Sequence, residues 1–186
     1  MFKILKDFCE PVRSTKYSAY IDLFSVEDVT IGAGETKIIK LGVKLDLEEI
    51  INGNDEVYNN PDKFLKSHYL EIALRSSLGA KGLIISNGIG IIDLDYPDEI
   101  GLIVHNPLQI SSRKYENLVS GGVRYLNDSY VSNRGFAIKK GDKVAQCTLK
   151  EHKGYLMGYE TETLRTVDLA QLTIERKLQI LSSLIF

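Results

Sequence analysis

The 186-residue sequence contains little cysteine, little proline and no tryptophan. Its two cysteines, Cys9 and Cys147, are too few for a disulfide framework, so a reducing cytoplasm is the simplest expectation. For a viral protein, the corresponding expectation is the host cytoplasm or the virion. No apolar run approaches the ~18 to 20 residues that cross a bilayer, and the first residues lack the apolar stretch of a signal peptide. The three scattered histidines and the absence of a C-x-x-C pair exclude a recognisable zinc site.

The sequence also lacks an excess of basic residues. Its 25 acidic and 23 basic side chains give a net charge of -2, which argues against direct nucleic-acid binding as the main function. Apolar residues make up 44% of the chain and charged residues 26%, the balance of a globular protein. The length predicts one domain, or one domain with insertions.

Short apolar and alternating segments broken by turn residues predict a mainly β fold, a barrel or a sandwich. The Asn87-Gly88 pair lies between two β-branched runs, which is the strongest short-range signal for a hairpin. The predicted strands cover residues 29–31, 36–47, 69–74, 83–93 (the hairpin), 101–106, 136–138 and 144–149.

Three segments depart from this β pattern. Residues 48–67 contain two clusters of turn residues and are expected to form an insertion with about one helical turn. Residues 108–133 are polar and form a second expected insertion. The tail lacks glycine and proline from Tyr159 on, and apolar residues at spacings of three and four predict an amphipathic helix over 168–184. We therefore expect a β domain over 1–155 and a helical tail over 156–186.

Three segments could carry chemistry. Residues 75–78, Arg-Ser-Ser-Leu, place an arginine and two hydroxyls at a strand exit, which suits phosphate binding; a turn with a helix cap at Ser76 or Ser77 is the alternative. Asp93 follows a run of isoleucines and is either a turn residue or a general base. Residues 141–146, Gly-Asp-Lys-Val-Ala-Gln, suit a turn that leads into a strand.

In this order and spacing, these segments resemble motifs of the trimeric deoxyuridine triphosphatases (dUTPases). Residues 75–78 match the second family motif, Arg-Ser-Gly-Leu, and 141–146 match the fourth, Gly-Asp-Arg-Ile-Ala-Gln. Residues 87–96 match the third, an Asn hairpin followed by Gly-x-Ile-Asp-x-Asp-Tyr. Residues 19–23, Ala-Tyr-Ile-Asp-Leu, match the first motif loosely.

The resemblance implies a distorted jelly-roll subunit, a homotrimer whose active sites are shared between subunits, and Mg²⁺ on the substrate's triphosphate. It implies a dUTP diphosphatase, in which water attacks the α-phosphorus in line and pyrophosphate leaves. By the resemblance, Asp93 would hold the attacking water, Asn87 and the hairpin backbone up to Gly90 would read the uracil, and Tyr96 would exclude a 2′-hydroxyl. The phosphates would be held by Arg75, Ser76, Ser77 and Gln146, and Asp22 would orient metal-bound water or form the floor of the site.

The family's fifth motif, a glycine-rich C-terminal arm that closes over the nucleotide, has no match in residues 150–186. This leaves a second hypothesis open, a dUTPase-fold binding or assembly protein, with a partner protein on the C-terminal helix. A third hypothesis is the related dCTP deaminase, which has a glutamate where this chain has Ile103 and lacks the Asp-x-Asp-Tyr pattern. The substrate could also be another deoxyuridine nucleotide.

Overall fold

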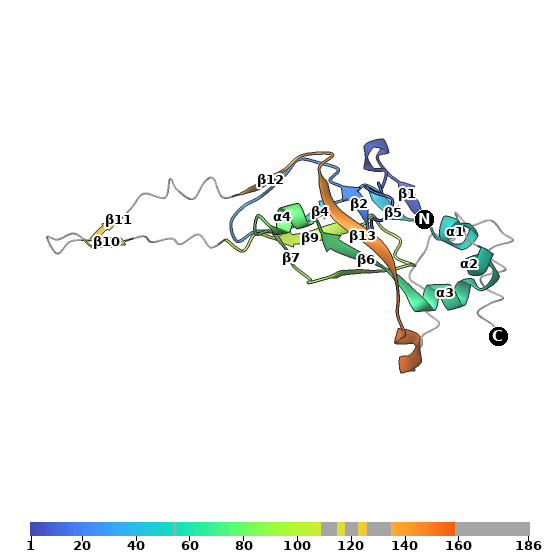
Figure 1. Ribbon diagram of the computed structural model, residues 1–186. Coiled ribbons are helices and arrows are strands. Elements are labelled where there is room, and N and C mark those ends of the chain that lie inside the picture. Colours follow the sequence, from blue (N-terminus) through green and yellow to red (C-terminus); the bar gives the residue numbers. More distant parts are fainter. Residues whose placement is uncertain (54, 109–114, 118–122, 126–134, 159–186) are drawn as a thin grey trace.

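The computed structural model describes residues 1–53, 55–108, 115–117, 123–125 and 135–158, and these form a mainly β structure as predicted (Figure 1). The strands are β1 (Phe2–Ile4), β2 (Ile21–Phe24), β3 (Val29–Ile31), β4 (Thr36–Lys40), β5 (Val43–Leu45), β6 (His68–Leu74), β7 (Ile84–Ile85), β8 (Gly90–Asp93), β9 (Gly101–His105), β10 (Tyr115–Asn117), β11 (Val123–Tyr125), β12 (Phe136–Ile138) and β13 (Lys143–Glu151). The helices are α1 (Leu47–Asn52), α2 (Asp55–Asn59), α3 (Pro61–Ser67) and α4 (Ser76–Gly79), with 3₁₀ turns η1 (Asp7–Cys9) and η3 (Gly154–Met157).

The strands pair antiparallel across five small sheets. The largest has the order β2-β13-β6-β8, and a second has the order β4-β9-β7. The remaining sheets are the pairs β1-β5, β3-β12 and β10-β11. Because neighbours in each sheet are seldom consecutive in the chain, the connections cross between sheets, as in a distorted jelly roll.

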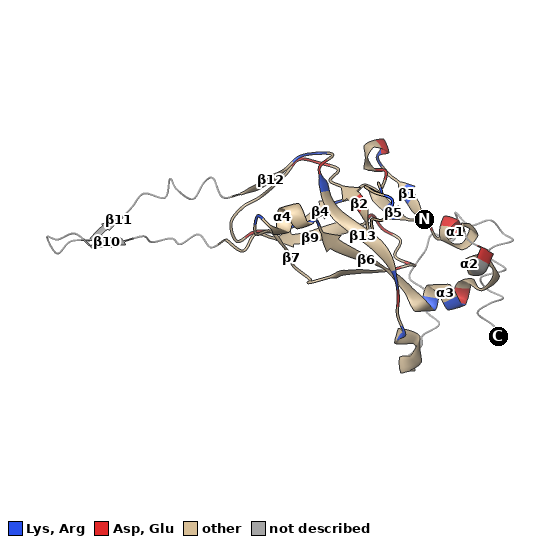
Figure 2. Cartoon of the chain, viewed as in Figure 1, with Lys and Arg blue, Asp and Glu red and all other residues tan. Residues whose placement is uncertain are grey.

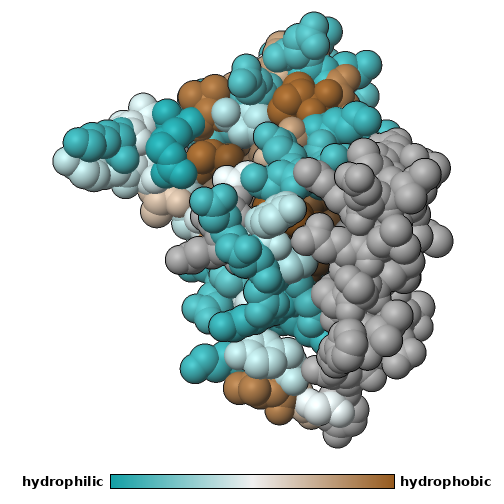
Figure 3. All heavy atoms as spheres, turned by 90° about the vertical axis from the view of Figure 1, so that its right-hand side faces the viewer, coloured by the Kyte–Doolittle hydropathy of each residue, from teal (hydrophilic) through white to brown (hydrophobic). Residues whose placement is uncertain are grey.

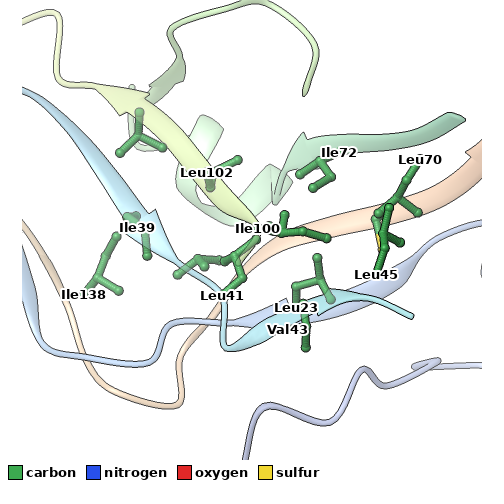
Figure 4. Packing of buried hydrophobic residues seen from close by; sticks show 14 of the residues in the cluster. Leu23, Ile39, Leu41, Val43, Leu45, Leu70, Ile72, Ile100, Leu102 and Ile138 are labelled. Carbon is green, nitrogen blue, oxygen red and sulfur yellow. The ribbon is translucent and has the colours of Figure 1, made fainter. Parts of the chain in front are cut away.

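The core lies between these sheets (Figure 4). Side chains alternate along a strand, so β6 and β13 each turn one set of residues inward and the other outward. The inward set of the large sheet includes Leu23, Leu70 and Ile72, which are almost fully buried. They meet apolar residues of the opposite layer: Ile39, Leu41, Val43, Ile100, Leu102 and Val104.

The expected single helical turn in residues 48–67 is wrong, because this segment belongs to three short helices, α1 to α3. Asp46 caps α1 by accepting a hydrogen bond from the Glu49 amide at 3.1 Å. Asn60 caps α3 in the same way, and Pro61 occupies the first turn. The residues that resemble a turn cluster are therefore the start signal of a helix.

The hairpin expected around Asn87-Gly88 is also wrong in its pairing. The chain does turn there, and Gly88 has a φ of 74°, which favours glycine. However, β7 pairs with β9, whereas β8 pairs with β6 in the other sheet. Each short β-branched run thus finds a longer partner strand, and Asn87-Gly88 forms the corner at which the chain changes sheets.

The second expected insertion contains the strand pair β10-β11, in which Tyr115 pairs with Tyr125. In Figure 1 this pair lies apart from the sheets of the body. The rest of residues 108–133, apart from Leu108, and the predicted helix over 168–184 lie outside the described residues.

Candidate functional site

The outward face of the large sheet carries residues from all four sequence motifs. Cross-strand partners share a face, and Gln146 on β13 pairs with Asp22 on β2 and with Ala73 on β6. Arg75 follows β6 two residues after Ala73, and its amide donates to the Val144 carbonyl at 3.1 Å. The sheet therefore brings Asp22, Arg75 and Gln146 together at one end.

Asp22 forms the centre of this group. Its carboxylate lies 2.6 Å from Nη1 of Arg75 and 2.9 Å from Nζ of Lys143, and Ser14 Oγ donates to it at 2.5 Å. The Asp22 side chain is only 8% exposed, whereas those of Arg75 and Lys143 are 29% and 39% exposed. One buried carboxylate thus anchors two cations that extend toward solvent.

The balance of forces on Asp22 favours its charged form. Burial raises the pKa of this carboxyl, but hydrogen bonds from Ser14 and Lys143 and the charge of Arg75 lower it by more. The net effect is a pKa below the usual range, so Asp22 stays ionised at neutral pH and holds both cations in place.

The two serines of the Arg-Ser-Ser-Leu segment begin α4 and are exposed. The alternative role as a helix cap is wrong, since Arg75 occupies the N-cap position and no side chain caps the helix. Both hydroxyls lie directly beside the Arg75 end of the sheet, where a phosphate ligand could reach them.

The third motif lies at the other end of the same face. Asp93 ends β8 and pairs with Tyr69, and the Tyr96 amide donates to the Asp93 carbonyl at 3.0 Å, closing a tight turn. Asp93 is exposed and Tyr96 is half-buried. Glu99 holds the end of this segment to the β4-β5 turn, because its Oε1 accepts a hydrogen bond from the Gly42 amide at 3.0 Å.

Two further residues of the motif differ in their environment. Asn87 is exposed at the corner between the sheets. Gly90 is buried, and a Cβ added there would lie 3.1 Å from Ile72 Cβ and 3.2 Å from the Ile72 carbonyl oxygen. Close packing of β8 on β6 therefore requires glycine at position 90.

The two ends of this face are far apart within one chain. Asp93 is opposite Tyr69, at the start of β6, whereas Arg75 follows the other end of that strand. At a rise of ~3.3 Å per residue, about 20 Å of strand separates them. The carboxylate of Asp93 and the guanidinium of Arg75 therefore do not meet around one small ligand within a single chain.

Between the two ends lies a network that sequence reasoning missed. The hydroxyls of Tyr20 and Tyr69 both donate to Glu71, and Lys150 Nζ lies 3.9 Å from the same carboxylate. The bond to Glu71 is the main cause that raises the pKa of Tyr20, to about 12. Period-two alternation along residues 69–74 places Tyr69 and Glu71 on one face, but only the sheet order brings Tyr20 to them.

Ser14 and Lys143 were also not predicted as site residues. Lys143 lies in the fourth motif, at the position where the dUTPase motif has arginine. The match to this motif could therefore have identified Lys143 as a site residue. Ser14 carried no such signal, because its contact with Asp22 depends on how the preceding loop folds back.

Across the described ranges, no group of three or more His, Cys, Asp or Glu side chains is arranged to hold a metal ion. In the same ranges, no helix is both long and apolar enough to span a bilayer. In Figure 2, basic and acidic residues are interspersed over the body, and the beginning of β13 is basic.

Solved structures of dUTPases share this architecture. The dUTPase of Streptococcus mutans superposes with a TM-score of 0.54 and 20% identity, over 82% of this chain and 95% of that one. A variant dUTPase from phage phi11 of S. aureus, whose structure coordinates a structural Mg(II) ion, gives a TM-score of 0.56 and 22% identity, over 90% and 95%. The chain therefore has the dUTPase fold.

Curated proteins similar in sequence are dUTPases as well. The Variola virus protein is 33% identical over 114 residues, which are 61% of this chain and 61% of that protein. The protein of Nautilia profundicola is 28% identical over 148 residues, 79% of this chain and 75% of that one. No family model matches the sequence. In sequence and in fold, this chain is similar to dUTPases, and it spans 61% of the length of the viral protein that it matches.

Proposed function

We propose that the protein is a dUTP diphosphatase, which hydrolyses dUTP to dUMP and pyrophosphate. The observation that carries this proposal is the convergence of Asp22, Arg75 and Gln146, from three distant segments, at one end of the sheet beside the Ser76 and Ser77 hydroxyls. A fixed arginine, an amide and two hydroxyls form a donor set that suits a triphosphate. The expected reaction is in-line attack of water on the α-phosphorus.

The roles proposed for the third motif follow from its chemistry. Asp93, exposed at the end of β8, would accept a proton from the attacking water. Asn87 would read the uracil edge with its amide, and Tyr96 would pack on the deoxyribose. Gly90 would contribute to uracil binding only through the backbone of β8, because Ile72 leaves no room for a side chain at this position.

Magnesium fits this donor set only in part. Mg²⁺ is commonly held through substrate phosphates, several waters and one or two carboxylates, and it neutralises phosphate charge during transfer. Because Asp22 is already paired with Arg75 and Lys143, we propose that it forms the floor of the site and orients these cations, and contacts the metal at most through water.

The distance between the two ends of the face supports a shared site. About 20 Å of β6 separates Arg75 from Asp93, so we propose that a homotrimer places the Asp93 segment of one subunit beside the Arg75 segment of its neighbour. In this arrangement, three equivalent sites would lie between subunits.

The cytoplasmic location also stays a prediction. Cys9 and Cys147 are both buried, and neither forms a disulfide.

A different activity, dCTP deamination, receives no support from the site. The glutamate of that family would stand at Ile103, on β9. Asn106 beyond it is buried and serves structure, because its amide donates to the Ile31 carbonyl at 3.2 Å and its oxygen accepts from the Leu108 amide.

A binding or assembly protein without activity remains the second candidate. Near the C-terminal end of the described body, η3 exposes Leu156 and Met157, 68% and 72% accessible, and Figure 3 shows an apolar patch at the lower end of the molecule. We propose that the predicted helix over 168–184 packs on an apolar surface, either of this trimer or of a partner protein. Deletion of residues 160–186 tests this: loss of assembly indicates packing within the trimer, and an intact trimer favours a partner.

The activity is tested by pyrophosphate release from dUTP, dCTP, dTTP and UTP with Mg²⁺. We expect release from dUTP alone among the four, and we expect Asp93→Asn to abolish it while dUTP binding persists, since the amide keeps the shape but loses basicity. Binding of dUTP without release by the native chain would support the second candidate. Wild-type turnover by Asp93→Asn would refute the role of Asp93.

A further inference from the structure

The loop of residues 13–18 is attached at two points to the end of the large sheet where Asp22, Arg75 and Gln146 meet. Val12, just before it, forms a bridge with Asp22, in which the Asp22 amide donates to the Val12 carbonyl at 2.8 Å. Within the loop, Ser14 Oγ donates to the Asp22 carboxylate at 2.5 Å. Thr15 and Ser18 close a turn, with the Ser18 amide 3.1 Å from the Thr15 carbonyl. The loop is thus folded over Asp22 and held there.

This loop adds positive charge to a place that is already basic. Arg13 and Lys16 are both exposed, and the ion-paired Lys143 lies with its Nζ 3.4 Å from Ser14 Oγ. Arg75 and Lys143 contact the Asp22 carboxylate itself. Within the loop, the Arg13 guanidinium donates to the Ser18 carbonyl, and Lys16 Nζ lies 5.4 Å from the centre of the Tyr17 ring. Residues 13–18 themselves, Arg-Ser-Thr-Lys-Tyr-Ser, contain no acidic side chain. Such an excess concentrates anions near the surface.

We infer that the loop of residues 13–18 forms a further part of the anion site and binds the polyphosphate of the nucleotide, with Arg13 and Lys16 supplying charge and Ser14 fixing the loop to Asp22. The inference rests on the proposed function for the identity of the nucleotide. Its chemistry, cations and hydroxyls around a fixed floor, selects for a polyphosphate rather than for the nucleoside part of the ligand.

The test is calorimetric binding of inorganic tripolyphosphate, together with the KM for dUTP. We expect the double variant Arg13→Gln/Lys16→Gln to bind tripolyphosphate roughly threefold to tenfold more weakly, to show a smaller salt dependence, and to raise KM more than it lowers kcat. The matched control is Lys3→Gln/Lys44→Gln, a pair of lysines that face each other across β1-β5, and it should bind as the native chain does.

Ser14 provides a second readout. Ser14→Ala should weaken tripolyphosphate binding in the same direction, and Ser14→Thr, which restores the hydroxyl, should recover it. Circular dichroism checks that each variant is folded. Unchanged tripolyphosphate binding by the folded double variant would overturn the inference, even if dUTP is hydrolysed. Weakened binding in a chain that hydrolyses no dUTP would keep the anion site and refute the proposed activity.

Discussion

The guanidinium of Arg75 lies 2.6 Å from the carboxylate of Asp22, which joins the end of β6 to β2 across the intervening strand β13. Lys143 at the start of β13 contacts the same carboxylate. The end of the sheet that carries the proposed phosphate-binding residues is therefore held together by one buried charge.

Replacing this charge should cost stability. Asp22→Asn leaves Arg75 and Lys143 without their counterion, and we expect the free energy of unfolding to fall by about 1–3 kcal/mol. Urea denaturation measures the loss. Asp98→Asn, at an exposed position, is the matched control and should change stability by no more than about 0.5 kcal/mol. Equal stability of the two variants would show that Asp22 does not anchor this end of the sheet.

The Glu71 network predicts a pH dependence. The hydrogen bond from Tyr20 is the main cause that lowers the pKa of Glu71, with a further contribution from Tyr69. A carboxyl with a lowered folded-state pKa stabilises the protein above its unfolded pKa of ~4.3, and this contribution is lost as the pH falls through the folded value. Glu71→Gln should therefore be less stable than the native chain at pH 7, and the difference should shrink in acid. A difference that stays constant from pH 7 to pH 3 would contradict this.

Gly90 should not tolerate a side chain. In Gly90→Ala the new methyl would press on Ile72, including its backbone oxygen, and overpacking of this kind costs about 1–3 kcal/mol. Thermal unfolding checks the prediction. Gly79→Ala is the control, because a Cβ there meets nothing within 4 Å, and it should leave stability unchanged or slightly higher. If both substitutions have the same effect, the close approach of β8 to β6 is not important for stability.

Tyr96 should set the discrimination against ribonucleotides. Its ring is proposed to fill the space that a 2′-hydroxyl would need. In Tyr96→Ala, the kcat/KM for dUTP divided by the kcat/KM for UTP should therefore be closer to one than in the native chain. Tyr96→Phe keeps the ring and is the control. A dUTP-to-UTP ratio that does not change in Tyr96→Ala would place this residue away from the sugar.

Sequence patterns predicted the bounds of a strand well where its own residues, rather than its partner strands, determine those bounds. Residues 136–138 form β12 with the expected bounds, since an apolar segment before a Lys-Lys-Gly-Asp turn has few alternatives. The corner at Asn87-Gly88 was misinterpreted as a hairpin because partner choice depends on distant strands. The helices α1 to α3 were missed because Asn60 and Pro61 begin a helix as readily as a turn.

The candidate site shows the same division. Sequence motifs selected Arg75, Gln146 and Asp93 as candidates, because their residue types and spacing carry the signal. They could not reveal that Ser14 and Lys143 meet at Asp22, or that Tyr20 reaches Glu71, because these contacts join segments that only the order β2-β13-β6-β8 brings together.

The central claim is that neighbouring chains combine the Arg75 end of one sheet with the Asp93 end of another into a dUTP-hydrolysing site. The most direct test mixes two variants, Arg75→Gln and Asp93→Asn, each inactive alone, under conditions that allow their subunits to exchange. Random trimers pair an intact Arg75 with a neighbour's intact Asp93 in about one quarter of the sites, so pyrophosphate release from dUTP should return to about one quarter of the native rate. Exchange without any recovery of activity would contradict the shared site.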